Sequence, residues 1–219
     1  GKYSENTAQT SDTCSDCPAG TVGVNNNNVV GDHDEKADCT TCSSGKYQDG
    51  TGETSCEDCP VGRYRTADAT NDNKNWDGTA NGNNNGMNAL ADCTICGAGK
   101  YSELVEATME TACLDCPSGR YGVGDASVIT EHDQLSDCLV CLAGQYATTT
   151  ASINCVTCGA GKYSQSLEAN TETACLDCPP GRYGVDNANV VNEHDQLSDC
   201  IQCIAGKYNE AAAQTSEIA

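Results

Sequence analysis

The stretch CLDCPSGRY at residues 113–121 decides the fold, because close copies of it recur along the whole chain. Two residues separate its cysteines, a glycine follows three positions after the second cysteine, and a tyrosine follows two positions after that glycine. Residues 56–64 read CEDCPVGRY, and residues 175–183 read CLDCPPGRY. All 18 cysteines fall in nine C-x-x-C pairs, so the unit C-x-x-C-x-x-G-x-Y is the building block of the chain.

Each unit predicts a tight turn at its glycine, with a positive φ that glycine adopts without strain. Eight of the nine units place tyrosine two residues later, and the first unit has Val22 there. We expect each tyrosine ring to lie on a neighbouring disulfide while its hydroxyl stays in water. These predicted repeat-packing residues are Tyr47, Tyr64, Tyr101, Tyr121, Tyr146, Tyr163, Tyr183 and Tyr208.

The units come in two kinds, with or without a proline after the second cysteine. The proline kind precedes a long step of 22 or 34 residues to the next cysteine, and the other kind a step of 14 or 17. Residues 96–141 and 158–203 are identical at 33 of 46 positions, which defines a 62-residue period. We predict four repeat blocks, read as a window on a longer array: cysteine-rich blocks at 1–58, 96–157 and 158–219, and a long-loop repeat with an Asn/Gly-rich insertion at 59–95.

The composition predicts small disulfide-rich repeats instead of one large core. The 219 residues include no phenylalanine and one tryptophan, too few large apolar side chains to offset the conformational entropy of one domain of that length. We predict an elongated rod of short β-hairpins and irregular loops, with little or no helix. One helical turn at L-E-A or A-L-A-D is the most helix expected, and V-I-T and N-V-V predict brief strands.

The net charge of −21 argues against nucleic acid as a partner, because binding phosphates requires Lys and Arg. It argues equally against binding to anionic membrane surfaces. No apolar run approaches transmembrane length, so no membrane insertion is expected in this segment. Cysteine at this density is typical of secreted proteins, so we predict an extracellular location.

The repeat narrows the disulfide pairing, although the sequence alone cannot choose among all the pairings of eighteen cysteines. A 1–3, 2–4 pattern uses C-x-x-C pairs two at a time and leaves one over in a period that holds three. A forward ladder, from each second cysteine to the next first cysteine, closes three bonds per period, each worth about 3–4 kcal/mol in the chain-entropy description. It leaves Cys14 and Cys203 for cysteines outside this sequence and predicts the bonds Cys17–Cys39, Cys42–Cys56, Cys59–Cys93, Cys96–Cys113, Cys116–Cys138, Cys141–Cys155, Cys158–Cys175 and Cys178–Cys200.

Zinc is the main alternative to disulfides, because two C-x-x-C pairs at this spacing also describe a zinc ribbon. Four thiolates per metal fit nine pairs poorly, so we favour disulfides. His33, His132 and His194 occupy equivalent places in D-H-D or E-H-D. They could mark a metal or pH-sensing site, but we expect exposed imidazoles between solvated acids.

No cofactor and no catalytic residue is predicted. The Asn-rich stretch 73–84 faintly follows a calcium loop, but Asn84 stands where that loop needs glutamate, so we expect a linker. Calcium on carboxylates such as Asp133 and Asp137 stays open, as do glycans on Ser/Thr, for example at 148–150. No nucleophile lies at a matched spacing from a histidine, so the sequence predicts no enzyme.

The quoted stretches at 56–64, 113–121 and 175–183 resemble the cysteine-rich repeats called ephrin-receptor-like, which are related to the tumour-necrosis-factor-receptor modules. The resemblance extends over essentially the whole chain. It departs from the pattern at the long 59–92 loop and at the missing tyrosine after Gly20. It implies an elongated, secreted rod with a ladder of disulfides.

The sequence favours a structural role. Near-identical repeats, low aromatic content and high charge predict a segment of an extracellular fibre, surface appendage or cell-coat protein, whose partners are neighbouring copies or repeats. The alternative is the ectodomain of a receptor or adhesion protein that binds a protein ligand.

Overall fold

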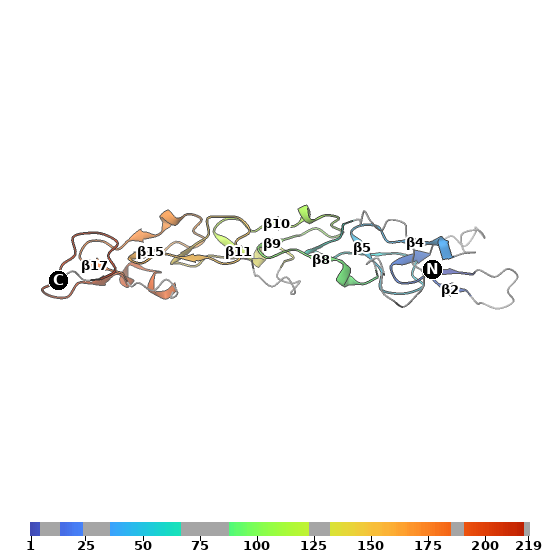
Figure 1. The fold of residues 1–219 in the computed structure, drawn as a ribbon, viewed down its shortest axis with the longest axis horizontal. Coiled ribbons are helices and arrows are strands. Elements are labelled where there is room, and N and C mark those ends of the chain that lie inside the picture. The colour runs from blue at the N-terminus through green and yellow to red at the C-terminus, as the bar shows by residue number, and fades with distance from the viewer. Residues whose placement is uncertain (5–13, 24–35, 67–87, 123–131, 185–190, 217–219) are drawn as a thin grey trace. The chain divides into compact units, whose positions relative to one another are not determined.

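The computed structural model describes residues 1–4, 14–23, 36–66, 88–122, 132–184 and 191–216 (Figure 1). The chain forms two compact units. The first consists of Gly1–Cys96 and Ser102–Cys113, and the second of Gly97–Tyr101 and Leu114–Ala219. The four predicted repeat blocks stay a prediction, because these units are defined by contacts and not by repeat boundaries.

Every strand belongs to a two-stranded antiparallel hairpin. The four hairpins described in the first unit are β1 (Lys2–Tyr3) with β2 (Ser15–Asp16), β3 (Thr21–Gly23) with β4 (Cys39–Thr41), β5 (Lys46–Tyr47) with β6 (Glu57–Asp58), and β7 (Arg63–Tyr64) with β8 (Thr94–Ile95). The five described in the second unit are β9 (Lys100–Tyr101) with β10 (Leu114–Asp115), β11 (Arg120–Gly122) with β12 (Cys138–Val140), β13 (Gln145–Tyr146) with β14 (Val156–Thr157), β15 (Lys162–Tyr163) with β16 (Leu176–Asp177), and β17 (Arg182–Tyr183) with β18 (Ile201–Gln202).

The repeat unit generates each hairpin in the same way. The two residues after the turn glycine form the first strand, and the two residues between the next pair of cysteines form the second. In β5–β6, Lys46 lies opposite Asp58 and Tyr47 lies opposite Glu57. We call the stretch from the second cysteine of one pair to the first cysteine of the next a module, numbered from module 1 (Cys17–Cys39) to module 8 (Cys178–Cys200).

The turn glycines have the predicted conformation. In module 2 the N–H of Lys46 donates to the carbonyl oxygen of Ser43 at 3.1 Å, which closes a β-turn with Gly45 at its third position. The carbonyl oxygen of Gly45 then accepts the N–H of Cys59 at 2.7 Å. The nine glycines have φ between 72° and 87° and are Gly20, Gly45, Gly62, Gly99, Gly119, Gly144, Gly161, Gly181 and Gly206.

Helix is confined to three-residue 3₁₀ turns within the part of the chain that the structure describes. Most of them directly precede the first cysteine of a pair. The A-L-A-D stretch forms one of these turns, whereas L-E-A forms none. V-I-T and most of the two N-V-V stretches lie outside the described residues. The turns are η2 (Lys36–Asp38), η3 (Leu90–Asp92), η4 (Glu110–Ala112), η6 (Leu135–Asp137), η7 (Glu172–Ala174), η8 (Val191–Glu193) and η9 (Leu197–Asp199).

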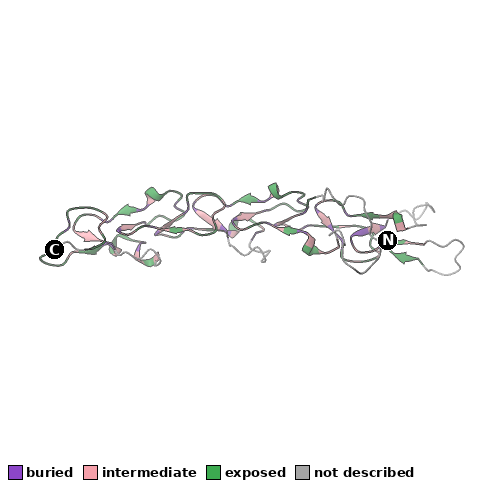
Figure 2. Ribbon diagram, in the orientation of Figure 1, coloured by how far each residue is buried: buried purple, intermediate pink, exposed green. Residues whose placement is uncertain are grey.

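The predicted fold class, small disulfide-rich repeats of β-hairpins, is confirmed. The buried apolar residues are mostly disulfide cysteines, joined by Tyr47 and by three alanines. Figure 2 shows how little of each hairpin is buried. The elongated shape of the whole chain stays a prediction.

Five of the turn glycines lie against the chain two modules further along, and they are Gly45, Gly99, Gly119, Gly144 and Gly161. In module 4, a Cβ added to Gly99 would lie 2.3 Å from the carbonyl oxygen of Ala151, in module 6. Gly45 meets Glu106 in the same way at 2.6 Å, and Gly119 meets Glu168 at 2.4 Å. Glycine is therefore needed here for two reasons, its positive φ and its missing side chain.

We predict that Gly99→Ala lowers the stability of the second unit by more than about 2 kcal/mol, because the left-handed conformation alone costs an alanine roughly 1–2 kcal/mol and the methyl group would overlap Ala151. Denaturant unfolding with the disulfides intact measures the loss. Gly97→Ala is the matched control, since a Cβ there would meet nothing within 4 Å. Equal effects of the two substitutions would contradict the proposed contact.

Candidate functional site at the module junctions

The residue after each unit's tyrosine joins neighbouring modules through its backbone. In module 6, the carbonyl oxygen of Ala147 accepts the N–H of Gly119 from module 5 at 2.8 Å. The N–H of Ala147 donates to the carbonyl oxygen of Ala169 in module 7 at 3.0 Å. One residue therefore links three successive modules, and we call this position the junction residue.

The junction residue is buried in all nine units, although its side chain varies. Ser102 and Ser164 are fully buried, and Arg65 is 8% exposed. Sequence reasoning missed this position because its residues share only their burial, and no residue type marks it. The junction residues are Gly23, Gln48, Arg65, Ser102, Gly122, Ala147, Ser164, Gly184 and Asn209.

A left-handed residue in each short loop completes the junction. Glu106, Ala151, Glu168 and Ala213 have φ between 54° and 57°. Their N–H groups donate to the carbonyl oxygen of the second cysteine that opens the preceding module, as Glu168 does to Cys141 at 2.8 Å. This bond places the loop over the turn glycine two modules back.

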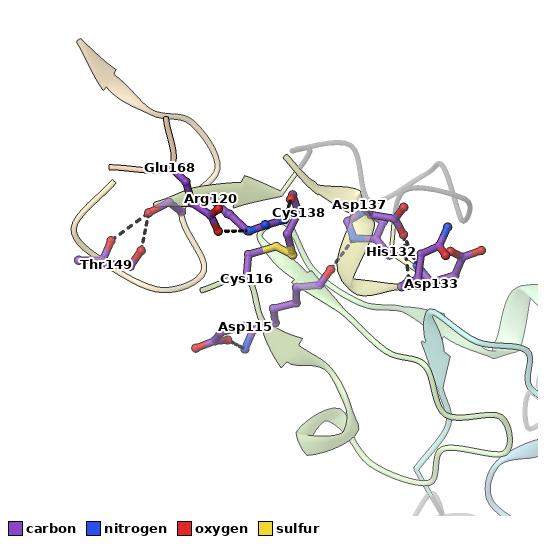
Figure 3. The surroundings of a disulfide bond; sticks show 12 residues. Asp115, Cys116, Arg120, His132, Asp133, Asp137, Cys138, Thr149 and Glu168 are labelled. Atoms are coloured by element: carbon purple, nitrogen blue, oxygen red, sulfur yellow. Dashed lines mark hydrogen bonds and ion pairs between the residues drawn. A yellow bond between two sulfur atoms is a disulfide. The ribbon is translucent and has the colours of Figure 1, made fainter. Parts of the chain in front are cut away.

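In two of the long modules, modules 5 and 8, a histidine contacts the preceding module. His132 and His194 are fully buried, so the prediction of exposed imidazoles is wrong for both. Their Nδ1 atoms donate to the carbonyl oxygens of Lys100 and Lys162 in the preceding module, each at 2.9 Å. Figure 3 shows this contact for His132. The buried strand carbonyl needs a donor, and imidazole supplies one. His33 lies outside the described residues.

The backbone of His194 shows that the long loop uses the same junction. Its carbonyl oxygen accepts the N–H of Ser164 at 2.8 Å. A Cβ added to Gly144, two modules back, would lie 3.0 Å from that carbonyl group. The acids that flank the histidine in sequence gave no sign of this burial.

Seven of the nine repeat units have a basic residue after the turn glycine, and its partner differs between the two kinds of module. In short modules, lysine pairs with an aspartate across the hairpin, as Lys100 does with Asp115 at 2.6 Å. This contact lowers the pKa of the Asp115 carboxyl. In long modules, arginine donates to the carbonyl oxygen of the closing first cysteine, as Arg182 does to Cys200 at 2.7 Å.

The carboxylates of Asp133 and Asp137 lie together beside the buried His132 (Figure 3). The N–H groups of Asp133 and Gln134 both donate to Asp137 Oδ2 at 2.9 Å, so Asp137 caps the turn η6. Burial, followed by the contact with Asp137, raises the pKa of the Asp133 carboxyl. Across the described residues, no group of three or more His, Cys, Asp or Glu is arranged to hold a metal ion. The calcium-like stretch 73–84 lies outside them.

The tyrosines differ in their surroundings. Tyr47 is 9% exposed and packs with Cys59 and Cys93, which form a disulfide. Its hydroxyl donates to Glu57 Oε2 at 2.7 Å. Tyr208 is 59% exposed. The other six tyrosines of the motif are half-buried, and their packing on disulfides stays a prediction.

The eight disulfides in the structure are the same pairs as the forward ladder predicted from the repeat. The bonds take up the sixteen sulfurs that the zinc alternative would use as thiolates. Cys14 and Cys203 are unpaired within this sequence.

Residues 32–74 match the family described as tyrosine-protein kinase ephrin type A/B receptor-like. Together with the eight disulfides, this match supports a cysteine-rich repeat of the ephrin-receptor-like type. No curated protein matches the chain. The matched family is a non-catalytic, receptor-type domain, and such disulfide-rich domains are typical of extracellular regions. Where the chain is described, no helix has the length and apolar character to span a membrane.

Mass spectrometry of unreduced peptides should recover the eight pairs of the ladder. The two shortest modules are the most decisive, since Cys42–Cys56 and Cys141–Cys155 each have a sequence separation of only 14. A parallel metal assay should find no stoichiometric zinc. Peptides that link Cys14 to Cys39 or Cys17 to Cys42 would contradict the ladder.

Tyr47 should ionise late in an alkaline titration. Its hydrogen bond to the Glu57 carboxylate, with smaller help from burial, raises its pKa to about 12. The folded state therefore gains stability from this group below the usual tyrosine pKa and loses it as the pH rises towards 12. Glu57→Gln keeps an acceptor but removes the charge, so absorbance at alkaline pH should show one tyrosine titrating earlier. An unchanged titration would contradict the contact.

Proposed function

We propose that this chain is a non-enzymatic structural repeat segment of an extracellular fibre, surface appendage or cell-coat protein. The observation that carries the proposal is the junction residue, whose backbone bonds join neighbouring modules along the chain. Because the backbone bonds of the described residues join modules that are neighbours or two apart in the sequence, such an array can grow by duplication without a new core. The identity of residues 96–141 and 158–203 at 33 of 46 positions is the mark of that growth.

The disulfide ladder suits a segment under tension. Each bond joins the two ends of a module, so a pulling force passes through the sulfurs and bypasses the loop. Between successive bonds the force crosses only one C-x-x-C step, for example from Cys39 to Cys42. The residues enclosed by each disulfide cannot be pulled straight unless a covalent bond breaks. The largest such loop has the 34-residue separation of Cys59 and Cys93.

Neighbouring copies or repeats are the proposed partners. The net charge of −21 supports a role without nucleic acid. The exposed hydroxyls at 148–150 leave room for glycans. No cofactor enters this proposal.

A receptor or adhesion ectodomain that binds a protein ligand is the second candidate. The family match at residues 32–74 favours it, because that family is named for receptors. In this case the modules would hold a ligand-binding surface away from the cell.

Immunogold electron microscopy of native material separates the two candidates. Antibodies raised against residues 132–184 should label filaments or an outer coat at regular intervals, because the array repeats. Antibodies blocked beforehand with the purified chain provide the control. Label confined to the plasma membrane, together with a soluble protein recovered by cross-linking, would contradict the structural role and favour the receptor.

A further inference from the structure

The first residue between the cysteines of each C-x-x-C pair differs between the two compact units of the chain. In the first unit this position is polar, and its residues are Ser15, Thr40, Glu57 and Thr94. In the second unit it is aliphatic, and its residues are Leu114, Leu139, Val156, Leu176 and Ile201. The hairpin is the same in both units, so folding of the module does not require the aliphatic side chain.

The aliphatic side chains gain little from folding, because they are 43–53% exposed. The second strands that carry them, such as β10, β16 and β18, are exposed along both residues (Figure 2). The first unit has polar residues at the same sites. The five aliphatic residues in succession therefore form a repeated apolar feature on the surface of the second unit.

The hairpin register places a tyrosine beside each aliphatic residue. Leu114 lies opposite Tyr101, and Leu176 lies opposite Tyr163. Residues directly opposite in an antiparallel pair share one face, so each hairpin presents an apolar pair. The lysine–aspartate pairs, such as Lys162 with Asp177, occupy the other register position, and their charges offset each other. We call these five sites the tyrosine–aliphatic pairs: Tyr101–Leu114, Tyr121–Leu139, Tyr146–Val156, Tyr163–Leu176 and Tyr183–Ile201.

We propose that the tyrosine–aliphatic pairs of the second unit bind the same pairs in a second copy of this chain. The surface repeats with the 62-residue period of the sequence, and only another copy of the array has the same spacing. A partner with a single binding patch would use one pair and leave the others exposed.

Four further residues of the same unit add exposed apolar surface to the tyrosine–aliphatic pairs. Those four residues are Leu142, Ile153, Leu167 and Ile204, each 55–64% exposed.

The proposal deepens the structural role by naming the surface through which copies associate. Sedimentation velocity of the whole chain, with free thiols alkylated to prevent disulfide-linked dimers, provides the test. The wild-type chain should self-associate as its concentration rises. Added salt should strengthen this association, because it screens the repulsion between two acidic chains.

The decisive variant carries Leu114→Thr, Leu139→Thr, Leu176→Thr and Ile201→Thr. The hairpin accepts threonine at this position, because Thr40 and Thr94 occupy it in the first unit. It should weaken self-association by about a hundredfold or more. The matched control is Leu104→Thr with Val105→Thr and Met109→Thr, which are 54–61% exposed in the first unit and should leave association unchanged. Equal free-thiol counts and matching near-ultraviolet circular dichroism establish that all three chains fold alike.

A wild-type chain that stays monomeric at every concentration and salt, or a quadruple variant that associates as tightly as wild type, would overturn the proposal. An equal loss of self-association in the control variant would also overturn the proposal. These outcomes are separate from failure of the structural role. Labelled filaments together with a monomeric chain would keep that role and reject this surface.

Discussion

The backbone bonds of the junction residue hold each module against its neighbours, and the other regular features serve to place that residue. Ser164 illustrates the requirement, because its carbonyl oxygen accepts a bond from Gly144 in one neighbour and its N–H donates to His194 in the other. Both bonds need the chain to approach closely at a turn where a side chain would overlap. The disulfide fixes the ends of the loop, and the glycine leaves the space. Because the interaction is between backbones, the junction side chain can be serine, glycine, alanine or arginine.

The parts of this architecture that lie within one repeat unit could be predicted from the sequence. The positive φ of the turn glycines and the pairing of cysteines both follow from a local motif and its count per period. Contacts between modules could not be predicted in this way. His194 lies between Glu193 and Asp195, as an exposed histidine would, and only the return of the loop onto Lys162 explains its burial. The left-handed Ala151 likewise has no local signal, since alanine is not typical of that conformation.

The two kinds of repeat unit hold their hairpins through different contacts of the basic side chain. In long modules arginine reaches carbonyl groups at the end of the loop, as Arg63 does with Cys93 at 2.6 Å. In the short modules that carry lysine, an aspartate of the second strand lies opposite the lysine instead. Guanidinium can serve several acceptors across a wider gap, whereas an ammonium group acts at one point. The association of arginine with a long step in the sequence therefore has a structural cause.

Folding of the modules uses the cysteines, the glycines and the backbone, and this leaves the outward positions of each hairpin free to differ. Glu57 and Leu176 occupy equivalent sites in hairpins of the same register, one with a hydrogen bond to its tyrosine and the other with an apolar contact surface. An array built in this way can lengthen by duplication and then change its surface block by block, without loss of stability in the ladder. The polar first unit and the aliphatic second unit are consistent with such a division. A compact domain could not separate folding from surface chemistry so fully, because all of its surface is supported by one core.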